Sequence, residues 1–204
     1  MHAIITDGSI SKYINHPKSL VIGDVRYPAK IFSLWTASEL AAIGIIEVTF
    51  DDSNKKDEKY YINTNQTYTY DADAGTVTAA YGNATAKAHA DTLFTAQDET
   101  DGLGTEGEVA TRGLKYNFIK TIKTQAAAIL QDTDWYILRK ADADTDVPSA
   151  ITTFRAAVRT KAAAMETLIT NASNTAAIKT LYTYTTNSDG VQSRPLGELP
   201  RLES

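Results

Sequence analysis

The sequence contains no cysteine among its 204 residues. This absence excludes disulfide bonds, cysteine-ligated zinc, iron–sulfur clusters and thiol nucleophiles. Long apolar runs are also missing: no stretch reaches the roughly 18 residues that a membrane-spanning helix needs, so we expect no membrane span. Basic residues are in a minority, with 20 Lys+Arg against 25 Asp+Glu and a formal net charge of -5. Because phosphate binding needs a clustered positive surface, this balance argues against a nucleic-acid partner.

Motifs that carry catalysis are absent as well. The histidines are scattered along the chain, at His2, His16 and His89, and no two of them have the spacing of metal ligands. Acidic residues gather in segments 51–59 and 142–146. Both segments are typical of solvated loops rather than of a calcium loop or a buried carboxylate pair. The sequence therefore predicts a protein that is not an enzyme and has no catalytic residue, bound cofactor or metal site.

Small and hydroxylated side chains are used heavily instead. The chain has 29 Ala and 28 Thr, and its aromatic residues include 11 Tyr but only 5 Phe. This bias is frequent in self-assembling surface proteins and fibre-associated proteins. A general compositional habit of the lineage is the alternative explanation.

Turn signals in the N-terminal half predict β-hairpins. Within residues 3–14, two short apolar runs flank Asp7-Gly8, a pair that readily adopts the positive φ angles of a tight hairpin turn. Gly23-Asp24 lies in the same way between residues 20–22 and 25–27. Pro28 then ends regular pairing because proline has no N–H to donate.

A capping box predicts a short helix after these hairpins. Thr36 can accept from the backbone N–H of Glu39 while the Glu39 carboxylate reaches back, so we expect a helix over residues 37–43 that Gly44 stops. The next segment, residues 45–50, is predicted to be a strand. Its expected sheet partners are residues 60–62, 67–70 and 76–81, which are separated by Asn-, Asp- and Gly-containing turns.

The spacing of apolar residues changes from the 2-residue period of strands in the first half of the chain to the 3.6-residue period of helices in the second half. Between these two halves the periodicity weakens, and residues 98–107 are acidic and rich in glycine. We therefore predict an α+β fold, in which a mostly antiparallel β region precedes a helical hairpin or small bundle. The predicted parts are a β-rich domain over residues 1–82, a linker over 83–107, a helical domain over 108–185 and an irregular tail over 186–204.

Apolar residues at intervals of three and four predict the helices of the second half. The first helix is predicted from about Glu108 to Gln131, with a start near Gly113 as the alternative because glycine weakens the first turns. Its apolar stripe is Leu114, Phe118, Ile122, Ala126 and Ile129. A longer helix opens at Val147-Pro148-Ser149 and carries Ile151, Phe154, Val158, Ala162, Met165 and Leu168. Between them, Asp132 or Thr133 is positioned to cap a short helix, and Ser173 is positioned to cap the last one.

Four side chains of the helical half are candidates for partner binding. Trp135 with Tyr136 is either a core plug at the helix junction, the interpretation that we favour, or an aromatic anchor for a partner. Arg155 and Arg159 lie one helical turn apart and either pair with nearby acids, the interpretation that we favour, or receive a carboxylate or phosphate from a partner. For an interaction surface, we expect both arginines to point outward.

The same segments carry a resemblance to a known family. The chain reads Thr133-Asp134-Trp135-Tyr136-Ile137-Leu138-Arg139-Lys140, then an acidic turn, then Val147-Pro148 and Thr153-Phe154-Arg155-Ala156-Ala157-Val158-Arg159. This arrangement resembles the C-terminal region of bacteriophage tail-fibre assembly and tail-associated proteins, in which Tyr often stands where this chain has Phe154. Residues 22–45 are also similar to the opening of small proteins encoded among tail genes of marine and cyanobacterial phages.

The resemblance implies a non-enzymatic protein of the virion tail, made in the host cytoplasm, that binds other tail proteins in a symmetric assembly such as a trimer. Two alternatives stay open: an assembly chaperone for the tail fibre, and a module that binds a host surface glycan. The tyrosines of the predicted sheet suit the second alternative, since their rings can stack on sugars; they are Tyr60, Tyr61, Tyr68, Tyr70 and Tyr81.

Overall fold

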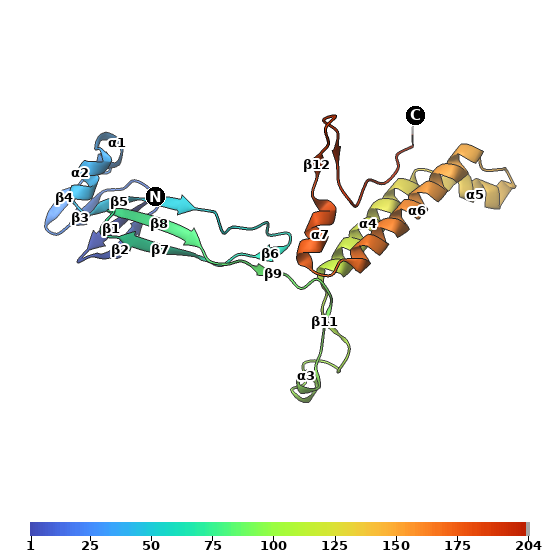
Figure 1. The fold of residues 1–204 in the computed structure, drawn as a ribbon, viewed down its shortest axis with the longest axis horizontal. Helices are drawn as coiled ribbons and strands as arrows, with labels where there is room; N and C mark the ends of the chain where they lie inside the picture. The colour runs from blue at the N-terminus through green and yellow to red at the C-terminus, as the bar shows by residue number, and fades with distance from the viewer. Residues whose placement is uncertain (203–204) are drawn as a thin grey trace. The chain divides into compact units, whose positions relative to one another are not determined.

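The computed structural model describes residues 1–202, and it confirms the predicted fold class. An N-terminal region rich in antiparallel strands precedes a C-terminal region of helices (Figure 1). The chain forms two compact units, Met1–Thr85 and the part from Ala86 onward. None of the helices within residues 1–202 is long and apolar enough to cross a membrane.

A five-stranded sheet forms the centre of the first unit. Its strand order is β2-β1-β5-β8-β7, and the strands are β1 (His2–Thr6), β2 (Ser9–Ile14), β5 (Ile45–Asp51), β7 (Gln66–Asp71) and β8 (Thr76–Tyr81). Every pairing is antiparallel except β5 with β8, which is parallel. Ala3, Val48, Val77 and Ala79 are buried together as one core cluster of this sheet.

Both predicted hairpins are present. Asp7 and Gly8 have φ angles of 51° and 72° and connect β1 to β2, as the turn signal predicts. β3 (Leu20–Ile22) and β4 (Val25–Tyr27) form the second hairpin around Gly23, whose φ is 58°. Local turn chemistry is sufficient to specify these two connections.

The capping box also forms as predicted and begins α2 (Ala37–Ala42), which follows the short helix α1 (Ile31–Leu34). Thr36 accepts from the Glu39 N–H, and the Glu39 carboxylate accepts from the Thr36 N–H at 2.7 Å. Ile31, Leu40 and Ile45 then form a second buried cluster between these helices and β5.

The predicted partners of the strand at residues 45–50 are only partly correct. β5 pairs with β8 and, on its other side, with β1, whereas β7 pairs with β8. The short strand β6 (Tyr61–Ile62) pairs with β9 (Thr85–Ala86) in a separate ladder. Half-buried and exposed residues alternate along β7, which suits a strand at the edge of the sheet. The neighbours of the central strand β5 are more deeply buried: β1 contains the fully buried Ala3, and β8 contains the fully buried Val77.

The segment predicted as a linker, residues 83–107, contains ordered elements. From Ala86 it belongs to the second unit, where β10 (Thr92–Leu93) pairs with β11 (Val109–Thr111) and a capping box starts α3 (Ala96–Thr100). Asp91 fixes this segment to the helices, since its carboxylate accepts from the Gly113 N–H at 2.8 Å and pairs with Arg112 at 2.6 Å. Polar contacts that no hydrophobic pattern reveals therefore order it.

The helices of the second unit are α4 (Leu114–Gln131), α5 (Asp134–Ala143), α6 (Ser149–Asn171) and α7 (Thr175–Tyr182). α4 and α6 run side by side (Figure 1) and bury the predicted apolar stripes against each other, with the exception of the half-buried Ile129 and the exposed Leu168. Asn174, rather than the predicted Ser173, caps α7, because its side-chain oxygen accepts from the Ala177 N–H at 2.9 Å.

The C-terminal tail, predicted as irregular from residue 186, contains one short ladder between β12 (Thr185–Thr186) and β13 (Gln192–Ser193). It then returns to the helices. Leu196 is completely buried, and its N–H donates to the Leu181 carbonyl at 3.0 Å. The tail up to Leu202 is therefore part of the helical unit.

Candidate protein-binding site

Arg155 does not point outward, so that prediction is wrong. The residue is only 6% exposed and lies on α6 against the junction between α4 and α5. One terminal nitrogen donates to the Leu130 carbonyl at 2.8 Å and to the Thr133 hydroxyl at 2.6 Å, and the other pairs with the Asp134 carboxylate at 2.8 Å. Arg155 is thus an internal clamp that holds the start of α5.

The end of α4 explains why a buried arginine belongs here. The last carbonyls of a helix lack the partners of the helix interior, and the Leu130 carbonyl accepts instead from the Thr133 N–H at 3.0 Å. Thr133, one of the two predicted candidates, is the N-cap residue of α5, but its side chain makes no capping hydrogen bond. Its hydroxyl donates to the Leu130 carbonyl at 2.9 Å and accepts from Arg155. A guanidinium with several fixed donors satisfies such a set of acceptors better than a lysine could.

The aromatic pair lies on the surface of α5. Trp135 is 49% exposed, so its favoured interpretation as a core residue is wrong, and Tyr136 is half-buried. Their ring centroids are 3.9 Å apart, and the Arg139 guanidinium lies over them, 4.6 Å from the Trp135 ring and 5.6 Å from the Tyr136 ring. Aromatic stacking and cation–π contact hold the pair in a fixed position.

Further large apolar residues are exposed on the same helix. Leu138 is 68% exposed and Ile137 is 43% exposed, and no side chain of α5 is buried. The sequence placed both residues on a helix without assigning them to a surface. The apolar residues of α5 do not follow a single stripe as those of α4 and α6 do, which is a sequence signal that α5 is not buried in the same way. At 100° per residue, Leu138 lies beside Trp135, whereas Ile137 lies on the opposite side of the helix. We call Trp135, Tyr136 and Leu138 the α5 face.

Charged groups lie on α6 and at the end of α5. Arg159 is exposed on α6, as predicted, one turn beyond the buried Arg155. Lys140 binds Asp144 at 2.7 Å and Asp146 at 2.8 Å, and these two hydrogen bonds raise the pKa of the Lys140 ammonium. Asp144 ends α5 with a φ of 48°. The acidic turn is therefore a solvated helix terminus that fixes the length of α5.

The tyrosines of the first unit have structural contacts. Tyr60 is buried, and lysine ammonium groups lie over two others, with Lys56 at 4.9 Å from the Tyr61 ring and Lys55 at 5.4 Å from the Tyr81 ring. Tyr68 packs on Tyr13, with ring centroids 4.7 Å apart, and Tyr70 packs on the sheet core. Tyr68 and Tyr70, together with Tyr13, also line an open pocket of about 370 Å³ on the sheet. The α5 face exposes larger apolar and aromatic side chains, so it is the stronger candidate for protein binding.

Comparisons with known proteins do not assign the chain to a family. No protein-family model, no curated protein and no solved structure matches the chain. Within residues 1–202, no group of three or more His, Asp or Glu side chains is arranged to hold a metal ion.

Proposed function

We propose that the protein is a non-enzymatic component of a bacteriophage tail that binds other tail proteins through the α5 face. The exposure of Trp135 beside Leu138, about one turn apart on one short helix, carries this proposal. Contiguous exposed apolar surface on a folded protein marks an interaction site, and Trp and Tyr are enriched among residues that dominate binding energy.

The residues that resemble tail-associated proteins support the proposal because they have two complementary roles in this fold. Thr133, Asp134 and Arg155 form the internal clamp. Trp135 and Tyr136, which stand between them in the pattern, are held on the surface by Arg139. The pattern thus contains both the residues that fix the start of α5 and the aromatic residues that lie on its surface.

The test is a pair of variants in the phage that encodes the chain. Trp135→Ser with Leu138→Ser removes two exposed anchors, so the fold should persist while association with the other tail proteins weakens about 30-fold or more, the equivalent of one interface hot spot of about 2 kcal/mol. Leu34→Ser is the matched control, since Leu34 is 73% exposed in the first unit. Unchanged association of the double variant, together with a normal melting curve, contradicts the proposal.

Mass spectrometry of purified virions separates tail component from chaperone. A tail component is present in finished particles at a fixed copy number. A chaperone raises the yield of correctly assembled fibre and is absent from the particles. The α5 face suits binding in both roles, and we propose virion residence as the primary function.

A further inference from the structure

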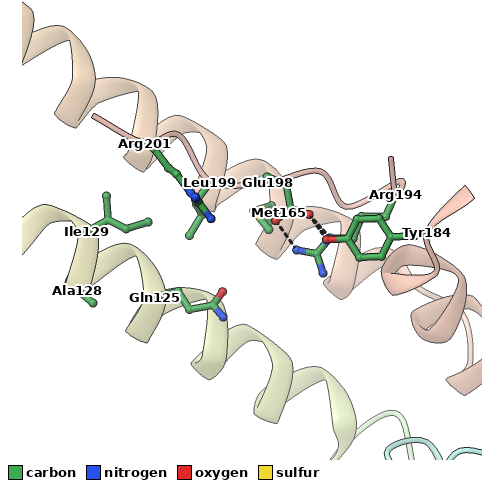
Figure 2. Close-up of a pocket in the computed structure, with 9 residues that line it drawn as sticks. All are labelled: Gln125, Ala128, Ile129, Met165, Tyr184, Arg194, Glu198, Leu199 and Arg201. Carbon is green, nitrogen blue, oxygen red and sulfur yellow. Dashed lines mark hydrogen bonds and ion pairs between the residues drawn. The ribbon is translucent and has the colours of Figure 1, made fainter. Parts of the chain in front are cut away.

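A groove in the helical unit is a second candidate binding site. Its volume is about 790 Å³, within the range of about 300–1,000 Å³ that is typical of ligand pockets. Residues of α4, Met165 of α6 and the C-terminal tail line it (Figure 2). It shares no residue with the α5 face.

The tail forms a fixed wall of this groove. Glu198 accepts hydrogen bonds from the Tyr184 hydroxyl and from Arg194, which pairs with it at 2.8 Å. Burial acts to raise the pKa of Glu198, but these hydrogen bonds outweigh it, so the pKa lies below the ordinary value and the carboxylate is ionised. The buried Leu196 anchors the same segment to α7. The groove is therefore preformed.

The lining combines an apolar surface with charged and polar groups. Ala128, Ile129 and Leu199 supply the accessible apolar part, whereas Met165 is completely buried. Figure 2 shows the Arg201 side chain running from the tail toward α4, where Gln125 also lines the groove. The charge of Arg201 also acts on Glu198 and helps to lower the pKa of that carboxylate, so one carboxylate of the lining faces the guanidinium groups of both Arg194 and Arg201.

The charge of the lining specifies the ligand. Two arginines, Arg194 and Arg201, stand against the single carboxylate of Glu198, so the lining keeps a net positive charge. Its complement is an apolar group that carries a carboxylate, which can bind Arg201 while Gln125 donates a second hydrogen bond. The groove is open along one side, so a longer chain can leave it. A free fatty acid needs most of its surface covered, which favours the end of a polypeptide over a lipid.

We propose that this groove binds the C-terminal end of a partner polypeptide whose last residues are aliphatic. The terminal carboxylate binds Arg201 and Gln125, and the aliphatic side chains contact Ala128, Ile129 and Leu199. Capture of a C-terminal carboxylate is a recurring mode of peptide binding.

Fluorescence anisotropy with the full-length protein tests the proposal. The probe is a labelled hexapeptide that ends in two leucines, with either a free or an amidated C-terminus. The free acid should bind about tenfold or more tightly than the amide, because a charge-assisted hydrogen bond is lost on amidation. Arg201→Gln should weaken binding of the acid by a similar factor and leave binding of the amide unchanged.

A steric variant tests the location. Ala128→Phe fills the groove and should abolish binding of both peptides, whereas Ala127→Phe, at the adjacent exposed position outside the groove, should leave it unchanged. Equal affinity for acid and amide, or full binding by the Ala128→Phe variant, overturns the proposal. Tighter binding of decanoate than of the acid peptide overturns the choice of a polypeptide end. Because the α5 variants leave the groove intact, the two proposals fail independently.

Discussion

Replacing Arg155 by alanine removes the internal clamp between α6 and α5. Two hydrogen bonds from a charged donor to neutral acceptors are lost, at 2.8 Å to Leu130 and 2.6 Å to Thr133. Hydrogen bonds of this kind contribute about 1.5–3 kcal/mol each. The Asp134 partner is half exposed to solvent, so its ion pair adds less than about 1 kcal/mol. Thr133 still binds the Leu130 carbonyl, which reduces the loss, and we expect destabilisation by about 2–4 kcal/mol.

Urea denaturation followed by circular dichroism measures this loss. Arg159→Ala is the matched control, because Arg159 is exposed one turn away on the same helix and should change stability by less than about 0.5 kcal/mol. Arg155→Met retains most of the buried apolar stem, so it separates packing from hydrogen bonding. Amide hydrogen exchange should speed up most in α5 for both Arg155 variants. If Arg155→Ala is as stable as Arg159→Ala, the clamp has no energetic role and the reasoning is wrong.

Two further changes test how the segment before α4 is fixed. Gly113→Ala should destabilise the protein by about 1–3 kcal/mol in a thermal melt, because a Cβ at this position would lie 2.2 Å from the Ala90 carbonyl oxygen; a melting temperature equal to wild type contradicts this close approach. Hydrogen bonds from the Gly113 N–H and from Arg112 hold the pKa of Asp91 below its ordinary value of 3.8, so the stability that Asp91 contributes is present above that pH and is lost as pH falls through the lower folded-state pKa. Wild type should therefore be more stable than Asp91→Asn at pH 6, and the difference should shrink toward pH 3; a constant difference contradicts the assignment.

Much of the fold could be predicted from sequence because its signals are local. The turn at Asp7-Gly8, the capping box of Thr36 and Glu39 and the stripes of α4 and α6 each involve residues within a few positions of one another. Local chemistry is sufficient to specify such features.

Features that depend on distant pairing could not be predicted in the same way. β5 has two neighbours, and the choice of β1 and β8 over β7 follows from the burial of several strands at once. The order of residues 86–107 depends on Asp91, which contacts Gly113 across 22 positions. Neither pairing leaves a periodic signal in the chain.

The sequence predicted that Arg155 and Arg159 both point outward, but only Arg159 does. Arg155 and Arg159 share a helix surface by spacing, yet only Arg155 lies opposite the end of α4, where the Leu130 carbonyl and the Thr133 hydroxyl accept from it. Helical spacing specifies which residues lie on the same side, whereas burial depends on what the neighbouring helix presents. A buried arginine at this point keeps Thr133 and Asp134 in position, so Trp135 is directed to the surface instead of the core. The internal position of Arg155 and the exposure of Trp135 therefore have a single cause.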